Sequence, residues 1–153
     1  MSKFKDFLRT EQKKRSDTPT PDNFDQLIRQ WQLQVKELHD QIEDWLAEES
    51  AEGLLNILRG YPVTVEEPEL PPWEVDILIV FFEELEIIHR PESRYSGDYE
   101  GSLIVETDTV HGRLVRRPEA NEDSFNNWFI KQDDYRPLTE KNYKNFLKEI
   151  IIG

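Results

Sequence analysis

The stretch FDQLIRQWQLQVKELHDQIEDW, residues 24–45, decides how this chain folds, because its apolar residues recur at alternating spacings of four and three. That period places them on one side of an α-helix. The stripe comprises Phe24, Ile28, Trp31, Val35, Leu38, Ile42 and Trp45. We therefore expect a long amphipathic helix that begins at Thr20 and Pro21, a residue pair typical of helix starts, and ends near Glu49.

The surface that covers this stripe belongs either to the same chain or to a second copy. Aromatic residues at stripe positions are unlike a regular two-stranded coiled coil, which prefers β-branched residues and leucine. Leu27, Leu33 and Leu46 widen the apolar side of the helix further. We expect the helix to pack on the chain's own sheet or helices, and a homodimer through residues 24–45 is the alternative.

Downstream of this helix the sequence changes from helical to extended character. Residues 52–62, EGLLNILRGYP, are expected to form a short helical turn that ends at Gly60 and Pro62. Residues 75–82 then place β-branched and aromatic side chains at both alternating sets of positions. This pattern predicts a central strand that is buried on both sides. After the acidic turn that follows it, residues 85–89 are expected to return antiparallel.

The rest of the chain predicts more short strands and a final helix. Strands are expected at residues 102–107, 112–117 and 127–131, where turn residues separate short apolar runs. Thr139 is expected to cap a C-terminal helix. Together the elements predict an α+β fold: N-terminal helices that include one long amphipathic helix, a mostly antiparallel sheet of about five strands, and a C-terminal helix. No strand–helix–strand alternation is present, which argues against a doubly wound nucleotide-binding fold.

Charge is distributed unevenly over the 153 residues, whose net charge is −13. Residues 1–15 carry six basic and two acidic residues, which leaves 13 basic and 30 acidic residues in the remainder. The prolines of RSDTPTP, residues 15–21, form a stiff connector. We therefore expect a basic N-terminal arm or short helix over residues 1–19, followed by a single α+β domain over residues 20–153.

An acidic domain restricts the partners that the chain can have. It repels nucleic acid phosphates, so a nucleic acid contact is expected only through residues 1–15. Its favoured partner is another protein with a basic or apolar surface. The simpler reason for the surplus acid is that it keeps the domain soluble.

Three features of the sequence indicate the cellular compartment in which the protein is expected to occur. The N-terminus is charged and has no apolar core of a secretory signal. The longest apolar run, Ile77 to Phe82, is far shorter than the roughly 20 residues that span a bilayer, so no membrane insertion is expected. Cysteine is absent, which fits a reducing compartment. We expect a cytoplasmic protein.

No catalytic or cofactor-binding signature occurs in the sequence, and we expect no enzyme, no cofactor and no metal. His39 and Glu43 have the spacing of a metal-binding pair on a helix, but an exposed pair on its polar side is the expected arrangement. The acids Glu83, Glu84 and Glu86 are expected to form a solvated hairpin turn. A catalytic pair would need different burial for its two carboxyl groups.

The candidate partner-binding residues are three tryptophans and three arginines. Large aromatic and arginine side chains dominate binding energy at protein interfaces. The candidates are Trp31, Trp45, Trp73, Arg113, Arg116 and Arg117. Together with Arg90 and Arg94, these arginines would form a basic patch if the strands bring them together. Pairing with the surplus acids across strands is the expected arrangement.

These observations favour a non-catalytic acidic protein that binds other proteins. It would act as an accessory subunit or as an inhibitor with the physical character of antitoxin and immunity proteins. One alternative is a small enzyme with an unfamiliar site built from Arg113, Arg116, His89 or His111 and nearby acids. Another is nucleic acid contact through the basic arm.

Overall fold

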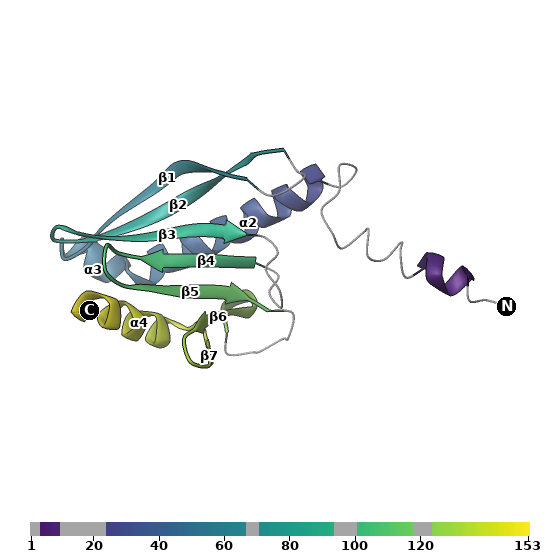
Figure 1. Cartoon of the computed structure of the whole chain (residues 1–153). Helices are drawn as coiled ribbons and strands as arrows, with labels where there is room; N and C mark the ends of the chain where they lie inside the picture. Colours follow the sequence, from purple (N-terminus) through teal and green to yellow (C-terminus); the bar gives the residue numbers. More distant parts are fainter. Residues whose placement is uncertain (1–3, 10–23, 67–70, 94–100, 118–123) are drawn as a thin grey trace.

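The computed structural model describes residues 4–9, 24–66, 71–93, 101–117 and 124–153. The N-terminal residues 4–9 are helical and are called the arm helix below. The body of the chain follows (Figure 1), and its elements in order are α2 (Phe24–Trp45), α3 (Ala47–Ala51), β1 (Asn56–Val65), β2 (Trp73–Phe82), β3 (Leu85–Ser93), β4 (Gly101–Glu106), β5 (His111–Arg116), η1 (Phe125–Asn127), β6 (Trp128–Lys131), β7 (Tyr135–Pro137) and α4 (Glu140–Ile152).

Within the described residues, the strands form one antiparallel sheet of seven strands in the order β1-β2-β3-β4-β5-β6-β7. Each strand pairs with the next one along the chain. The α+β class and the antiparallel sheet are thereby confirmed. The sheet has seven strands where about five were expected, and β1 and β7 account for the difference. The expected start of the long helix at Thr20 lies outside the described residues.

Strand β1 occupies residues for which we expected a helical turn, and that prediction is wrong. Gly60 has φ +76°, and the register of β1 against β2 shifts between Leu58 and Tyr61. A glycine in this conformation accommodates an extra residue as a β-bulge and does not end a helix here. Pro62 is tolerated because β1 is an edge strand, where one side of the backbone needs no ladder hydrogen bond.

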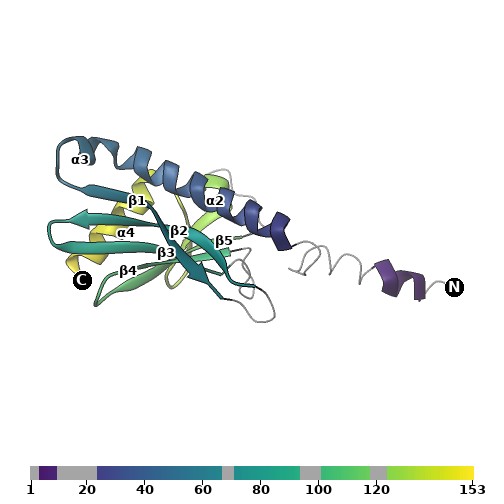
Figure 2. The ribbon, with the colours of Figure 1, turned by 90° about the horizontal axis from the view of Figure 1, so that it is seen from above.

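Helix α2 lies along one face of the sheet (Figure 2), which we call the core face. Ile28, Trp31, Val35, Leu38 and Ile42 of its apolar stripe are at most 6% exposed and belong to the hydrophobic core. Intramolecular packing of the stripe is thereby confirmed. The helix ends at Trp45, and the residues expected to continue it to Glu49 belong to the separate short helix α3.

Two glycines allow both long helices to approach this face closely. A Cβ atom on Gly101 of β4 would collide with the Trp31 ring, and one on Gly112 of β5 would lie 2.5 Å from the Phe146 ring. Helix α4 is capped as expected, since the Asn142 backbone N–H donates to the Thr139 hydroxyl at 3.1 Å. Helices α2 and α4 therefore share one face of the sheet.

The opposite side, which we call the open face, carries the other set of alternating side chains. Direct strand pairing defines two rows across it. One row is Leu58, Ile79, Ile88, Glu106 and His111, and the other is Arg90, Ile104, Arg113, Lys131 and Tyr135. Ile77 and Leu78, adjacent in β2, are both buried, so this strand buries both of its faces at its middle, as predicted.

Among the described helices, none combines the length and the apolar composition that crossing a bilayer requires.

Candidate protein-binding surface

The three candidate tryptophans have different positions. Trp31 is 0% exposed and Trp73 is 5% exposed, so both are core residues and neither can anchor a partner on the surface. Trp45 is half-buried at the end of α2. Its ring meets the Phe125 ring edge-on, with centroids 6.2 Å apart, and the Tyr143 ring at 5.7 Å. Of the three, Trp45 alone reaches towards the surface, and it does so beneath Phe125.

The candidate arginines do not form one patch. Arg113 lies on the open face, and its Nε donates to a Glu92 carboxylate oxygen at 3.0 Å. Arg90 pairs with Glu106 at 2.7 Å. The expected pairing with acids across strands is thus confirmed for these two arginines: Glu106 lies in β4, next to β3, whereas Glu92 lies in β3, two strands from β5. The guanidinium of Arg117 lies 4.1 Å from the centroid of the Tyr135 ring.

Arg116 faces the other way, because it pairs with Gly101 and Trp128 on the core face. Its Nε donates to the backbone carbonyl of Asn126 at 3.2 Å. The alternation of a β-strand therefore separates Arg113 and Arg116 of GRLVRR onto opposite faces. Arg94 lies outside the described residues.

The turn that Arg116 contacts is unusual in its backbone. Asn126 and Asn127 have φ values of +47° and +64°, in the left-handed region that non-glycine residues seldom adopt. Asparagine tolerates this region better than most residues. The turn brings Phe125 and Asn126 next to helix α2, where the Asn126 side-chain amide donates to Glu37 at 3.4 Å.

This turn and helix α2 enclose a shallow depression of about 380 Å³, which we call the acidic groove. It is lined by Glu37, Asp40, Gln41, Asp44, Phe125 and Asn126. Glu37, Gln41 and Asp44 are spaced four and three positions apart, so they lie on one side of α2, and Asp40 lies next to Gln41. Carboxylates therefore form one wall of the groove and an aromatic ring, backed by Trp45, forms part of the other.

The charge of the groove is only partly compensated. Hydrogen bonds from Lys36, at 2.9 Å, and Arg59, at 2.6 Å, hold the pKa of Asp40 below its usual value. Within the described part of the chain, Asp44 forms no ion pair. The last turn of α2 contains no basic residue, although the helix macrodipole favours cations at that end. The groove thus carries excess negative charge.

His39 contradicts the prediction of an exposed pair with Glu43. It is 1% exposed, and its Nε2 has no hydrogen-bond partner among the described residues. Burial, with smaller contributions from nearby His89 and Arg59, lowers its pKa to about 3, so the ring is neutral at pH 7. Glu43 instead pairs with Arg59 at 2.9 Å. Position 39 is buried because the side of α2 that packs against the rest of the fold includes residues outside the apolar stripe, such as Leu46 near its end.

A second groove of about 840 Å³ lies between α2 and strands β1 and β2. His39 and Val35 are among the residues of α2 that line it, and its rim mixes the cations Arg29, Lys36 and Arg59 with acids of α2 and β2. Cationic and acidic side chains both occur around this rim, so it favours neither sign of charge. The described residues include no group of three or more His, Asp or Glu side chains that could hold a metal ion.

The residues proposed for an alternative enzyme site do not converge. His89 is 0% exposed on the core face, whereas His111 is exposed on the open face. Arg113 and Arg116 also lie on opposite faces. Glu83, Glu84 and Glu86 are all exposed, which confirms the solvated hairpin. No protein-family model, curated protein or solved structure matches this chain.

Proposed function

We propose that the chain is a non-catalytic protein-binding protein whose acidic groove receives a lysine or arginine side chain from a basic partner. The observation that carries this proposal is the placement of Glu37 and Asp44 opposite Phe125 in one depression. A cationic side chain there would contact carboxylates on one side and an aromatic ring on the other. Charge-assisted hydrogen bonds contribute about 1.5–3 kcal/mol and an exposed cation–π contact about 0.5–1 kcal/mol.

The local structure of the groove supports a role in binding. Acids near the C-terminal end of α2 oppose the helix macrodipole, and the left-handed Asn126–Asn127 turn stores backbone strain. Local features that lower the stability of the fold, such as this acid placement and this strained turn, concentrate at functional sites in proteins. Arg116 and Trp45 contribute by fixing the turn and the ring of Phe125, so they act as supports of the groove.

The net charge of −13 supports the same class of partner. A negative field attracts basic surfaces from a distance and accelerates their association, and added salt weakens this attraction. An accessory subunit or an inhibitor of a basic protein would use such a field. Because the chain contains no cysteine, we place this activity in the cytoplasm.

Affinity purification from the source cell tests the proposal. The tagged full chain serves as bait beside a Glu37→Lys/Asp44→Lys variant, and co-purifying proteins are quantified. The matched control is Asp133→Lys/Asp134→Lys, which makes the same charge change at two exposed residues between β6 and β7. We expect a basic protein that is captured by the wild type and the control and lost with the groove variant.

Two outcomes would contradict the proposal. Equal loss of the partner with the groove variant and with the control would show that net charge, and not the groove, determines binding. Equal capture by all three baits would place the interface elsewhere on the molecule. Circular dichroism of each bait establishes that the variants are folded.

A further inference from the structure

The arm helix presents an apolar stripe to solvent. Phe4, Phe7 and Leu8 are 73%, 57% and 49% exposed, and their spacing of three and four places them on one side of the helix. Lys5 and Arg9 add positive charge beside them. A helix of this length is marginal in water by itself. These features are typical of a segment that is stabilised by docking on a surface with an apolar floor and an acidic rim.

The body of the protein contains such a surface at the ends of two hairpins. A concave region of about 360 Å³ is lined by Leu85 and Ile88, with carboxylates around them, and we call it the rimmed patch. The full lining is Glu84, Leu85, Glu86, Ile88, Glu106, Thr107 and Asp108. Ile88 continues into the apolar row of the open face through Ile79 and Leu58, the last of which is 43% exposed.

We propose that the arm helix of one copy docks on the rimmed patch of a second copy, and that the two copies exchange arms to form a symmetric dimer. The chemistry of the two surfaces is complementary. Phe4, Phe7 and Leu8 would cover the apolar floor, while Lys5 and Arg9 would face the acidic rim. This inference concerns self-association, and it does not depend on the proposed binding of a basic partner.

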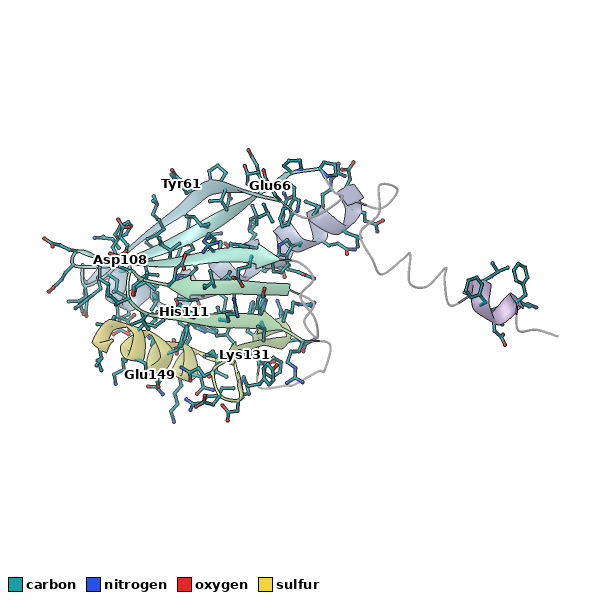
Figure 3. All side chains as sticks on the ribbon, in the orientation of Figure 1. Tyr61, Glu66, Asp108, His111, Lys131 and Glu149 are labelled. Atoms are coloured by element: carbon teal, nitrogen blue, oxygen red, sulfur yellow. The ribbon has the colours of Figure 1, made fainter. Side chains whose placement is uncertain are left out.

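The geometry of the chain favours docking between copies over docking within one copy. The body begins at Phe24, at one end of the molecule, whereas Asp108 of the rimmed patch lies at the opposite end (Figure 3). Helix α2 alone covers about 33 Å of this length at 1.5 Å per residue. Residues 10–23 span at most about 50 Å when fully extended. Docking within one copy would need the connector to extend to about two thirds of its full length or more and also to pass around the body.

The apolar floor of the rimmed patch is small, so we expect a weak dimer. Leu85 and Ile88 are both half-buried, and the reciprocal exchange of two arms doubles the area that a single arm buries. Specific interfaces bury about 1,200–2,000 Å². Because the interface is small and a short helix must be held in one orientation on docking, we expect a dissociation constant in the range of about 1–100 µM.

Sedimentation velocity of the full chain between about 1 and 500 µM tests this proposal, since the range brackets the expected dissociation constant. The wild type is expected to pass from monomer to dimer. Lys5→Glu/Arg9→Glu on the arm and Glu84→Lys/Glu86→Lys on the rim are each expected to raise the dissociation constant at least about tenfold. Combining the four changes in one chain restores opposite charges across the interface and is expected to restore the dimer.

Further variants distinguish arm docking from an effect of net charge alone. Asp133→Lys/Asp134→Lys makes the same charge change away from the rimmed patch and is expected to leave the dimer intact. Phe4→Ala/Phe7→Ala/Leu8→Ala is expected to abolish it while the circular dichroism of the body is unchanged. A wild type that remains monomeric at the highest concentration, or a dimer that survives both the arm and the rim changes, would overturn the proposal.

Discussion

His89 of β3 and Tyr143 of α4 join the sheet to the C-terminal helix by a hydrogen bond of 2.7 Å inside the core. The Nδ1 atom of His89 lies 3.3 Å from the Ile87 carbonyl, which can only accept, so Nδ1 carries the proton. Nε2 is then the acceptor, and the Tyr143 hydroxyl donates to it. Both side chains are 0% exposed, so water cannot replace this bond.

Tyr143→Phe is therefore expected to lower the free energy of unfolding by about 1–3 kcal/mol, because it leaves a buried histidine nitrogen without a donor. Urea denaturation monitored by circular dichroism measures the change. Tyr61→Phe removes the same hydroxyl from a residue that is 58% exposed and is expected to change the free energy by less than about 0.5 kcal/mol. Equal effects of the two substitutions would show that the buried bond does not stabilise the fold.

Acid is expected to destabilise the protein through its two buried histidines. Burial lowers the pKa of His89 to about 4 from the ordinary 6.5, and burial together with nearby His89 and Arg59 lowers that of His39 to about 3. Between these values and 6.5 the unfolded chain binds protons that the folded chain does not. The free energy of unfolding is therefore highest above pH 6.5 and falls as the pH decreases towards 4.

At pH 5 each histidine is expected to have reduced the free energy of unfolding by about 2 kcal/mol relative to pH 7. Urea denaturation at intervals between pH 7 and pH 5 measures this slope, in a range where ordinary carboxyl groups remain ionised. A flat profile would contradict the neutral, buried state of both rings. Histidine ring signals in NMR spectra would then be expected to titrate near pH 6.5.

Gly101 is expected to tolerate no side chain, because Trp31 occupies the space where a Cβ atom would lie. Gly101→Ala forces the ring or the strand to move, which typically costs about 1–3 kcal/mol in a packed core. Thermal and urea denaturation measure the loss. A double-mutant cycle with Trp31→Leu supplies the control, since the two effects should be less than additive if the collision causes the loss. Additive effects would assign the loss to the strand itself.

The sequence predicted those elements whose stabilisation comes from a regular apolar period. Helices α2 and α4 and strand β2 are examples, because their buried residues follow spacings of 3.6 or 2 with few exceptions. Strand β1 was not predicted, since Gly60 and Pro62 resemble the end of a helix. Only the pairing with β2 shows that Gly60 accommodates a bulge and that Pro62 stands on an edge.

The candidate site was less predictable than the fold. Trp45 and Arg116 were chosen as partner-binding residues, but the sequence could not show that they lie beneath a groove. The contact between Glu37 and Asn126 joins residues 89 positions apart. The Asn126–Asn127 pair was the one available signal, because consecutive asparagines tolerate left-handed backbone. Burial of His39 also depends on the width of the apolar side of α2, which periodicity does not measure.

Asp44 offers a test of whether the acidic groove is maintained at a cost to stability. It is exposed near the C-terminal end of α2, where the macrodipole disfavours an acid, and it forms no ion pair within the described residues. Asp44→Asn is therefore expected to raise the free energy of unfolding by about 0.3–1 kcal/mol at low salt, as measured by urea denaturation. Asp25→Asn, in the first turn of the same helix, is expected to lower the free energy of unfolding instead, because an acid is favourable there.

If both substitutions shift stability in the same direction, overall charge repulsion and not the helix dipole determines the effect. If Asp44→Asn also leaves capture of the partner unchanged, the acid at this position does not serve binding.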